Sequence, residues 1–337
     1  MGLQKQRIFL EKNVETKARH SEIIGESTAI KNSLTLLDKI AYTSCTVLIT
    51  GETGTGKELV ARAIHNNSPR KNKSMIKVNC ATLPANLIES ELFGHERGSF
   101  TGAYERHIGK FEMANNNTLF LDEIGEMPLE LQAKLLSVLQ DRVIYRIGSK
   151  NTITIDVRII AATNRNLELE VEEGRFRADL YYRLNIFPIE LPSLRERRDD
   201  IIPLANHFIE KISERLAKKI NMVTHWAFQD LLDYDWPGNI RELEHTVERS
   251  ILLAEDKTIR RFCIPVKKRK LMAKSGQDRT FIKTIAENER DHITLILEYC
   301  RGRISGINGA AHLLGVPSTT LHSKLKRLGI DKFDSGH

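Results

Sequence analysis

The strongest constraint on the fold of this chain is a glycine-rich segment that follows an apolar run and precedes a helical pattern. It consists of Gly51, Glu52, Thr53, Gly54, Thr55, Gly56 and Lys57. Glycines let the backbone curl so that successive N–H groups point at phosphate oxygens, and the helix that follows adds partial positive charge. A chance glycine-rich loop is the alternative, but the strand before it and the helix after it favour a nucleotide site.

Two carboxylates further along the chain complete a candidate hydrolysis site. Asp122 and Glu123 end an apolar run that resembles a strand. Asp122 is suited to hold Mg²⁺, and Glu123 is suited to polarise the water that attacks the γ-phosphate of ATP, while Lys57 would bind the β- and γ-phosphates. Glu58 departs from the usual loop, which has Ser or Thr for magnesium at that position.

Short apolar runs alternate with helical stretches from Glu22 onward, which predicts an α/β fold with a parallel sheet covered on both faces. The predicted strands are Thr46–Thr50, Met75–Asn79, Leu119–Asp122, Arg158–Thr163 and Ile186–Glu190, and the helices between them are 58–66, 129–140 and 177–184. No strand is predicted after Pro192. Helical spacing at 199–218, 226–232 and 239–253 instead predicts an all-helical subdomain.

Length and composition predict a multi-domain cytoplasmic protein. With 337 residues the chain is too long for one ordinary core. It has no apolar run of membrane-spanning length, and its first residues lack the apolar core of a secretory signal. Its four cysteines have no paired spacing and are expected to be buried thiols; they are Cys45, Cys80, Cys263 and Cys300.

The positive charge of the chain is concentrated near its C-terminal third. The formal net charge is +7, yet the segment from Lys257 to Lys274 alone carries eight basic residues and no acidic one, which leaves the rest near −1 (7 − 8). Such a segment beside a polyanion-binding domain would contact phosphates. A solvated linker with a run of charge is an equally good interpretation of the segment by itself.

The C-terminal region has the pattern of a helix-turn-helix. Residues 307–330 are predicted to form two short helices joined at Gly315, and Leu321, Leu325 and Leu328 give the second helix one apolar stripe. Its other face carries the candidate DNA-contacting residues Ser318, Thr319, Thr320, His322, Ser323, Lys324 and Arg327. A protein-binding helical hairpin is the alternative, and the neighbouring basic segment favours DNA.

Residues 91–103 (ELFGHERGSFTGA) resemble the loop by which sigma-54-dependent activators of the AAA+ superfamily touch the sigma factor. The matching contact residues are Gly98, Ser99, Phe100, Thr101, Gly102 and Ala103, with Ser99 where the family usually has Ala. Phe100 between small residues and glycines is an odd choice for a core, because the glycines give up backbone entropy and bury nothing, so an exposed partner contact is expected. The resemblance extends from Ile23 to Ile330 and accounts for Glu58, and within the family it is strongest to the formate-hydrogenlyase activator branch.

The resemblance implies further roles at matching positions. Asn79 would restrain the catalytic Glu123, Asn164 would sense the γ-phosphate, and Arg241 would be a second sensor from the helical lid. Arg177 and Arg183 lie in the segment of the arginine fingers that reach into a neighbouring subunit. Six residues at about 100° each would place them roughly 120° apart on a helix, so they would act differently.

Surface salt bridges to Glu173 or Asp179 are the alternative for these two arginines. The C-terminal domain resembles the Fis type, although Pro317 stands where the family often has a capping Ser or Asp. Ser318 would then cap the helix instead.

Together these patterns predict an ATP-dependent transcription activator with five segments. They are a linker or regulatory remnant (1–21), an AAA+ α/β core (22–192), a helical lid (193–254), a basic linker (255–280) and a helix-turn-helix domain (281–337). The implied cofactors are ATP and Mg²⁺. The implied partners are sigma-54, RNA polymerase, upstream double-stranded DNA and further copies of the chain in a ring, expected to be a hexamer.

Two other functions fit parts of the sequence. A repressor with a nucleotide-sensing AAA+ module would not need Phe100, Glu123 or the fingers, and a protein-remodelling AAA+ chaperone would not need the DNA motif. Residues 1–21 are too short for a sensory domain. Constitutive activity, control by another protein, or truncation of a longer chain all remain open.

Overall fold

The computed structural model describes residues 22–82, 84–254 and 257–265, together with 289–290, 292–294, 296–297, 300, 303–306, 309–328 and 330. The chain divides into two compact units, Met1–Pro265 and Val266–His337. The predicted start of the end domain near Phe281, and most of the basic segment, lie outside the described residues.

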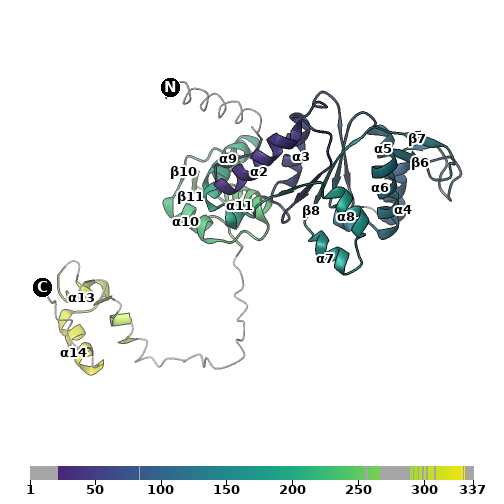
Figure 1. Cartoon of the computed structure of the whole chain (residues 1–337). Helices are drawn as coiled ribbons and strands as arrows, with labels where there is room; N and C mark the ends of the chain where they lie inside the picture. Colours follow the sequence, from purple (N-terminus) through teal and green to yellow (C-terminus); the bar gives the residue numbers. More distant parts are fainter. Residues whose placement is uncertain are drawn as a thin grey trace, which may run out of the picture. The chain divides into compact units, whose positions relative to one another are not determined.

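A five-stranded parallel sheet forms the centre of the larger unit, in the order β2-β5-β8-β1-β9 (Figure 1). Its strands are β1 (Val47–Thr50), β2 (Met75–Asn79), β5 (Thr118–Asp122), β8 (Arg158–Thr163) and β9 (Phe187–Glu190). Each of the five predicted strands is confirmed to within one residue at either end. Parallel strands buried on both faces are continuous apolar runs, which is why the sequence shows them clearly.

Helices cover both faces of this sheet, as predicted. Leu119 and Leu121 of β5 pack on one side with α4, α6 and α8, whereas Phe120 packs on the other side with α2 and α3 (Figure 1). The helices of this subdomain are α2 (Thr28–Ala41), α3 (Lys57–Asn66), α4 (Ala85–Phe93), α5 (Lys110–Met113), α6 (Leu129–Asp141), α7 (Leu167–Glu172), α8 (Ala178–Leu184) and the short 3₁₀ turn η1 (Ile124–Glu126). The fold is therefore a three-layered α/β sandwich.

Two short antiparallel pairs extend from the sandwich and were not predicted. The first joins β3 (Gly94–His95) to β4 (His107–Ile108), and the second joins β6 (Val143–Tyr145) to β7 (Thr152–Thr154). Strands of two or three residues are too short to show an alternating pattern. A Cβ on Gly94 would lie 2.5 Å from the His107 carbonyl oxygen, so this close approach requires glycine.

The second subdomain is mainly helical, but the prediction that it has no strand is wrong. Two short parallel strands, β10 (Met222–Val223) and β11 (Thr258–Ile259), pair beside its helices. The helical elements are η2 (Leu194–Glu196), η3 (Arg198–Asp200), α9 (Ile201–Arg215), α10 (His225–Asp233) and α11 (Asn239–Leu253). Trp236 is fully buried in their core, and its indole N–H donates to the Leu231 carbonyl at 2.8 Å.

The described part of the smaller unit contains α13 (Ala310–Leu313) and α14 (Ser318–Leu328). Leu321 and Leu325 are buried there, which confirms the predicted apolar stripe, and Gly315 turns the chain with a φ of +64°. The capping role predicted for Ser318 is wrong. Ser318 is the first helical residue, and the Pro317 carbonyl before it accepts the Leu321 N–H.

All four cysteines are free thiols, but the expectation that they are buried holds only for Cys80. Cys45 is exposed because it lies in the loop that precedes β1, and Cys263 and Cys300 are half-buried. In the part of the chain that the structure describes, no helix is long and apolar enough to cross a membrane.

Candidate nucleotide-binding site

The register of the parallel strands brings the candidate residues to one edge of the sheet. Asn79 at the end of β2 pairs with Asp122 at the end of β5, and Thr50 at the end of β1 pairs with Thr163 at the end of β8. The glycine-rich loop leaves β1 at this edge and enters α3 at Lys57. Ligands bind at the carboxyl ends of such strands in open α/β sheets.

The glycine-rich loop packs closely against the second subdomain. A Cβ on Gly54 would lie 2.3 Å from the Gly238 carbonyl oxygen, and the φ of Gly54 is +80°. Both constraints require glycine at this position. The Ile240 N–H donates to the Gly54 carbonyl at 2.9 Å, which fixes the start of α11 on the loop.

Lys57 is buried at the start of α3 with its ammonium turned back to the loop. Its Nζ donates to the Gly51 carbonyl at 2.9 Å and lies 3.8 Å from Glu123 Oε1. Burial lowers the pKa of Lys57, and the nearby charges of Glu123 and Asp122 oppose that shift. A phosphate group at the loop would supply the further negative charge that a desolvated ammonium favours.

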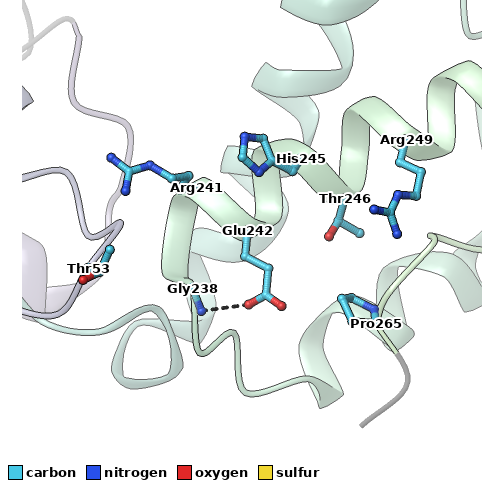
Figure 2. A pocket seen from close by; sticks show the side chains of 8 residues that line it. All are labelled: Thr53, Gly238, Arg241, Glu242, His245, Thr246, Arg249 and Pro265. Carbon is cyan, nitrogen blue, oxygen red and sulfur yellow. Dashed lines mark hydrogen bonds between the residues drawn. The ribbon is translucent and has the colours of Figure 1, made fainter.

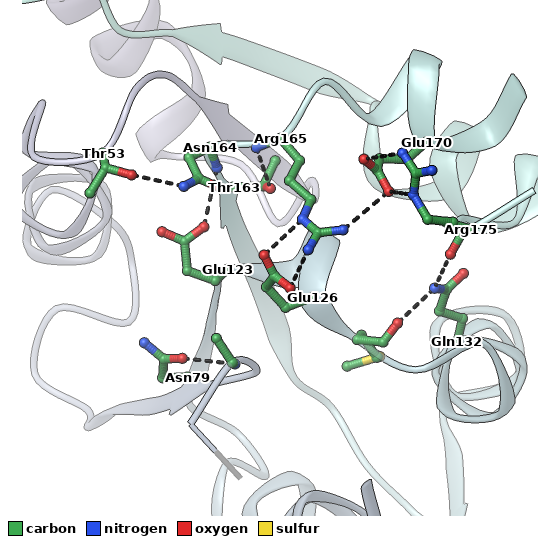
Figure 3. Close-up of polar contacts among 12 residues, drawn as sticks. Thr53, Asn79, Glu123, Glu126, Gln132, Thr163, Asn164, Arg165, Glu170 and Arg175 are labelled. Atoms are coloured by element: carbon green, nitrogen blue, oxygen red, sulfur yellow. Dashed lines mark hydrogen bonds and ion pairs between the residues drawn. The ribbon is translucent and has the colours of Figure 1, made fainter. Parts of the chain in front are cut away.

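Glu123 is held by the ends of neighbouring strands. Its backbone is left-handed, with φ +52°, and its Oε2 accepts the Asn164 N–H at 3.2 Å. The Asn164 side-chain amide donates in turn to Thr53 Oγ1 at 2.8 Å (Figure 3). One network therefore links the candidate base, the candidate γ-phosphate sensor and the phosphate loop.

Asn79 lies beside this network without joining it in this conformation. Its side-chain oxygen accepts the Ala81 N–H at 2.9 Å, and among the described residues no hydrogen bond joins it to Glu123. The restraint of Glu123 by Asn79 stays a prediction.

Asp122 is the carboxylate best placed for Mg²⁺. Its Oδ2 already faces a cation, the Lys77 ammonium, at 3.7 Å, and Lys77 donates to Glu58 Oε2 at 2.6 Å. The described residues contain no cluster of three or more metal-binding side chains. A site with one carboxylate fits Mg²⁺, which keeps water ligands and takes its remaining oxygens from nucleotide phosphates.

Glu52 of the glycine-rich loop takes part in the contact between the two subdomains. No partner for it is predicted from the sequence. Glu52 accepts from Arg195 at 2.9 Å and from the Asn239 amide at 3.1 Å, and these hydrogen bonds lower its pKa. The Asn239 amide also donates to the Thr53 carbonyl at 3.0 Å. Glu52 and Arg195 are 143 residues apart, so no local pattern could have paired them.

Arg241 reaches the loop from α11 and borders a cavity of about 390 Å³. Figure 2 shows its side chain extending from α11 toward the loop that carries Thr53, and its role as a second sensor stays a prediction. The cavity is lined by Thr53, Gly238, Arg241, Glu242, His245, Thr246, Arg249 and Pro265. Arg241, His245 and Arg249 are exposed and lie four residues apart, so this face of α11 is basic.

A second cavity, of about 560 Å³, lies on the other side of the loop between the two subdomains. Its walls combine apolar and charged side chains. The apolar ones include Ile23, Ile24, Leu204, Phe208 and Ile240, and the charged ones include Arg62, Lys211 and Glu244. Its size and lining suit a flat organic ring. Sequence reasoning missed it because its walls come from four separate segments.

The two predicted arginine fingers occupy different local structures. Arg177 precedes α8 as its N-cap with extended backbone, so the predicted helix 177–184 begins one residue later and the 120° separation does not apply. Its guanidinium pairs with Asp179 at 2.7 Å, which is one of the alternatives considered above. Arg183 donates to the Leu139 carbonyl at 2.9 Å, and both arginines are exposed.

A chain of polar contacts leads from the sensor to this arginine segment (Figure 3). Arg165, next to Asn164, pairs with Glu126 at 2.7 Å and with Glu170 at 3.2 Å. Glu170 also binds Arg175 at 2.7 Å, which lowers the pKa of Glu170 to about 2 and keeps it ionised. Buried Gln132 completes the chain, since it donates to the Arg175 carbonyl and accepts the Arg177 N–H.

The loop between β3 and β4 carries the exposed aromatic that the sequence predicts. Phe100 is 44% exposed, and its ring lies edge-on to the His95 imidazole at a centroid distance of 4.9 Å. Gly98 and Gly102 flank it with φ of +80° and +108° and open space beyond both. A short turn closed by the Gly98 N–H on the Ala103 carbonyl presents Phe100 at the tip.

Ser99 rests against the second antiparallel pair. A Cβ on Gly148, in the turn between β6 and β7, would lie 2.6 Å from the Ser99 Cβ. The Ser99 hydroxyl is buried in this contact and has no hydrogen-bond partner among the described residues. The change from the usual Ala therefore places an unpaired polar group between the two hairpins.

Two family models match the chain. The sigma-54 interaction domain matches residues 23–190, and the AAA+ ATPase lid domain matches residues 195–280. The regulatory protein AtoC of Escherichia coli (strain K12) is 44% identical over 341 residues, which are 99% of this chain and 73% of AtoC. The chain belongs to the family of sigma-54-dependent transcriptional activators.

Two longer relatives agree with the predicted likeness to the formate hydrogenlyase activators. The DNA-binding transcriptional activator HyfR of Escherichia coli (strain K12) is 45% identical, over 98% of this chain and 51% of HyfR. The formate hydrogenlyase transcriptional activator FhlA of the same strain is 49% identical, over 92% of this chain and 45% of FhlA. The chain spans about half the length of these relatives.

Solved structures support the same family. The structure of NtrX from Brucella abortus in complex with ATP superposes with a TM-score of 0.68 at 34% identity, over 96% of this chain and 73% of that one. The ATPγS-bound Hsp104 structure, with a TM-score of 0.53 and 18% identity, shows the AAA+ fold alone. A relative of known structure therefore covers 96% of this chain.

The unpaired hydroxyl of Ser99 gives a testable prediction for stability. Ser99→Ala should raise the free energy of unfolding of the larger unit by about 1 kcal/mol, because it removes a buried group without a partner. Urea unfolding of the full chain measures the change. Ser149→Ala is the matched control and should give no gain, because Ser149 Oγ accepts the Asn151 N–H. A loss of stability in Ser99→Ala would contradict the assignment.

Proposed function

We propose that this chain is an ATP-dependent transcription activator that binds upstream DNA and uses ATP hydrolysis to remodel RNA polymerase carrying sigma-54 to the open complex. One observation carries the proposal. The loop with exposed Phe100 extends from the same α/β subdomain that holds Lys57 and Glu123 at the carboxyl edge of its sheet. Such a subdomain has both an energy-yielding site and a partner contact.

The site accounts for each part of ATP. The adenine would enter the apolar cavity lined by Ile24 and Phe208, and the phosphates would lie on the N–H groups of the glycine-rich loop. Lys57 and Arg241 would supply positive charge to the phosphates, and Asp122 would hold Mg²⁺, which neutralises the charge that develops on them. These assignments place the nucleotide between the two subdomains.

Hydrolysis would use the network around Glu123. Glu123 orients a water and accepts its proton as the water oxygen bonds to the γ-phosphorus, while the bond from that phosphorus to the ADP oxygen breaks. Asn164 is bonded to both Glu123 and Thr53, so a γ-phosphate beside the loop would change its contacts. Asn79, free of Glu123 in this conformation, would restrain the base when it turns toward it.

Assembly into a ring, expected to be a hexamer, would complete the site. Arg177 and Arg183 are exposed, and the polar chain that starts beside Asn164 ends at the Arg177 N–H. A finger acting on the neighbour's γ-phosphate requires Arg177 to leave Asp179, an exposed ion pair that costs little to break. The state of one ATP site would thereby reach the next subunit.

The smaller unit would bind DNA through α14. Ser318, Thr319, Thr320, His322 and Ser323 lie on the side of the helix away from buried Leu321 and Leu325 or at its margin. Lys324 and Arg327 both pair with Glu289, Arg327 at 3.0 Å. These two residues would therefore exchange a carboxylate for a DNA phosphate when the helix binds.

Loss of the Phe100 ring should separate ATP hydrolysis from promoter opening. Phe100→Ala should keep ATP and promoter DNA binding and abolish open-complex formation, because work on sigma-54 needs a contact that changes with nucleotide state. The measurement is in vitro transcription from a sigma-54 promoter. Trp226→Ala is the matched control, since Trp226 is an exposed aromatic in the lid subdomain. Full activation by Phe100→Ala would refute the proposal.

Mixing two inactive variants tests whether the fingers act across subunits. Lys57→Ala lacks phosphate binding and Arg177→Ala lacks the finger, so a mixed ring should regain ATPase activity where an intact loop faces an intact finger. Steady-state phosphate release from mixtures of verified co-assembly is the readout. Arg183→Ala mixed in the same way shows which arginine is the finger. Mixtures with no more activity than either parent would exclude both.

A further inference from the structure

Lys77 is a cation beside the proposed nucleotide site to which the sequence analysis gave no role. It lies in β2, two residues before Asn79, on the strand next to β5. Its Nζ is 2.6 Å from Glu58 Oε2 and 3.7 Å from Asp122 Oδ2. Lys77 thus bridges the carboxylate suited to Mg²⁺ and the residue that replaces the usual magnesium-binding hydroxyl.

Glu58 and Asp122 differ in their exposure to solvent and in the cations that lie near them. Glu58 is 43% exposed and also faces Arg62 NH2 at 3.6 Å, so it has a second cation on the helix side. Asp122 is only 16% exposed and forms an ion pair with Lys77, while the buried Lys57 ammonium also contributes charge nearby. The less hydrated carboxylate therefore depends most on the Lys77 charge.

An ammonium and Mg²⁺ beside the same carboxylate repel each other and compete for its oxygen atoms. Mg²⁺ takes carboxylate oxygens directly or through water in a tight octahedral shell, so a neighbouring ammonium opposes its binding. We propose that Lys77 is a resident counter-ion of Asp122 that Mg²⁺ displaces, and that Lys77 thereby sets the Mg²⁺ concentration at which nucleotide is held. This inference rests on the proposed ATP site.

Glu58 gains a role in the same arrangement. It accepts from Lys77 at 2.6 Å, so the ammonium keeps one partner when Mg²⁺ takes Asp122. The carboxylate that follows Lys57 then retains the displaced lysine instead of binding the metal. An acidic residue at position 58 can hold the Lys77 ammonium because Lys77 lies nearby on β2.

The Mg²⁺ dependence of nucleotide binding by the full chain tests this proposal without relying on hydrolysis. The chain and a fluorescent ADP analogue are titrated with Mg²⁺, and the midpoint is the Mg²⁺ concentration at which half of the analogue is bound. Direct binding of Mn²⁺, followed by electron paramagnetic resonance, gives a second measure of metal affinity. Lys77→Met should lower the midpoint about 3- to 10-fold, since one positive charge near Asp122 is removed. Lys77→Arg keeps the charge and should stay close to wild type.

Two further variants separate displacement from a general change in charge. Arg62→Met removes a cation that contacts Glu58 but not Asp122, so its midpoint should change far less than that of Lys77→Met. Glu58→Gln should raise the midpoint in the wild-type background, because Lys77 loses its second partner. The same change in the Lys77→Met background should have a smaller effect, as a double-mutant cycle would show.

If Lys77→Met leaves the Mg²⁺ midpoint unchanged or raises it, the counter-ion role is wrong, while the proposed ATP site still stands. Equal effects of Lys77→Met and Arg62→Met would also overturn it, because the change would then follow net charge alone. Failure of the wild-type chain to bind the ADP analogue at any Mg²⁺ concentration would refute the proposed nucleotide site itself.

Discussion

The parallel register of the central sheet is the constraint on which the rest of the site depends. Because β2, β5, β8 and β1 all run the same way, the polar residues that end them meet at one edge. Asp122 and Glu123 come from one strand, and Asn164 follows the next one over. The hydrogen bond from the Asn164 N–H to Glu123 is a direct result, and a shift of either strand would break it.

The glycine-rich loop is also the joint between the two subdomains. Gly54 touches Gly238, and Asn239 binds both Glu52 and the loop backbone. A nucleotide on this loop would therefore contact the α/β core and the lid together, so its binding energy can change how they sit on each other. The hairpin with Phe100 follows α4 of the same core directly, and the arginine segment is reached through Glu170 and Gln132.

The sequence predicts what depends on local pattern. Strands such as β8 are continuous apolar runs. The glycine-rich loop and the Phe100 loop have sequence motifs that are specific enough to recognise. Contacts between distant segments, such as Arg195 with Glu52, have no such pattern. The two-residue strand β10 and the N-cap position of Arg177 were missed for a related reason, since each depends on packing against elements far along the chain.

The central claim is that Glu123 is the base of an ATPase whose other residues bind nucleotide, and Glu123→Gln tests it most directly. The amide keeps the size of the side chain and can still meet the Asn164 backbone, but it accepts a proton poorly. The measurement is equilibrium ATP binding together with single-turnover hydrolysis by the purified full chain. The account predicts near wild-type ATP affinity with hydrolysis slowed about 100-fold or more. Wild-type turnover by Glu123→Gln would contradict it.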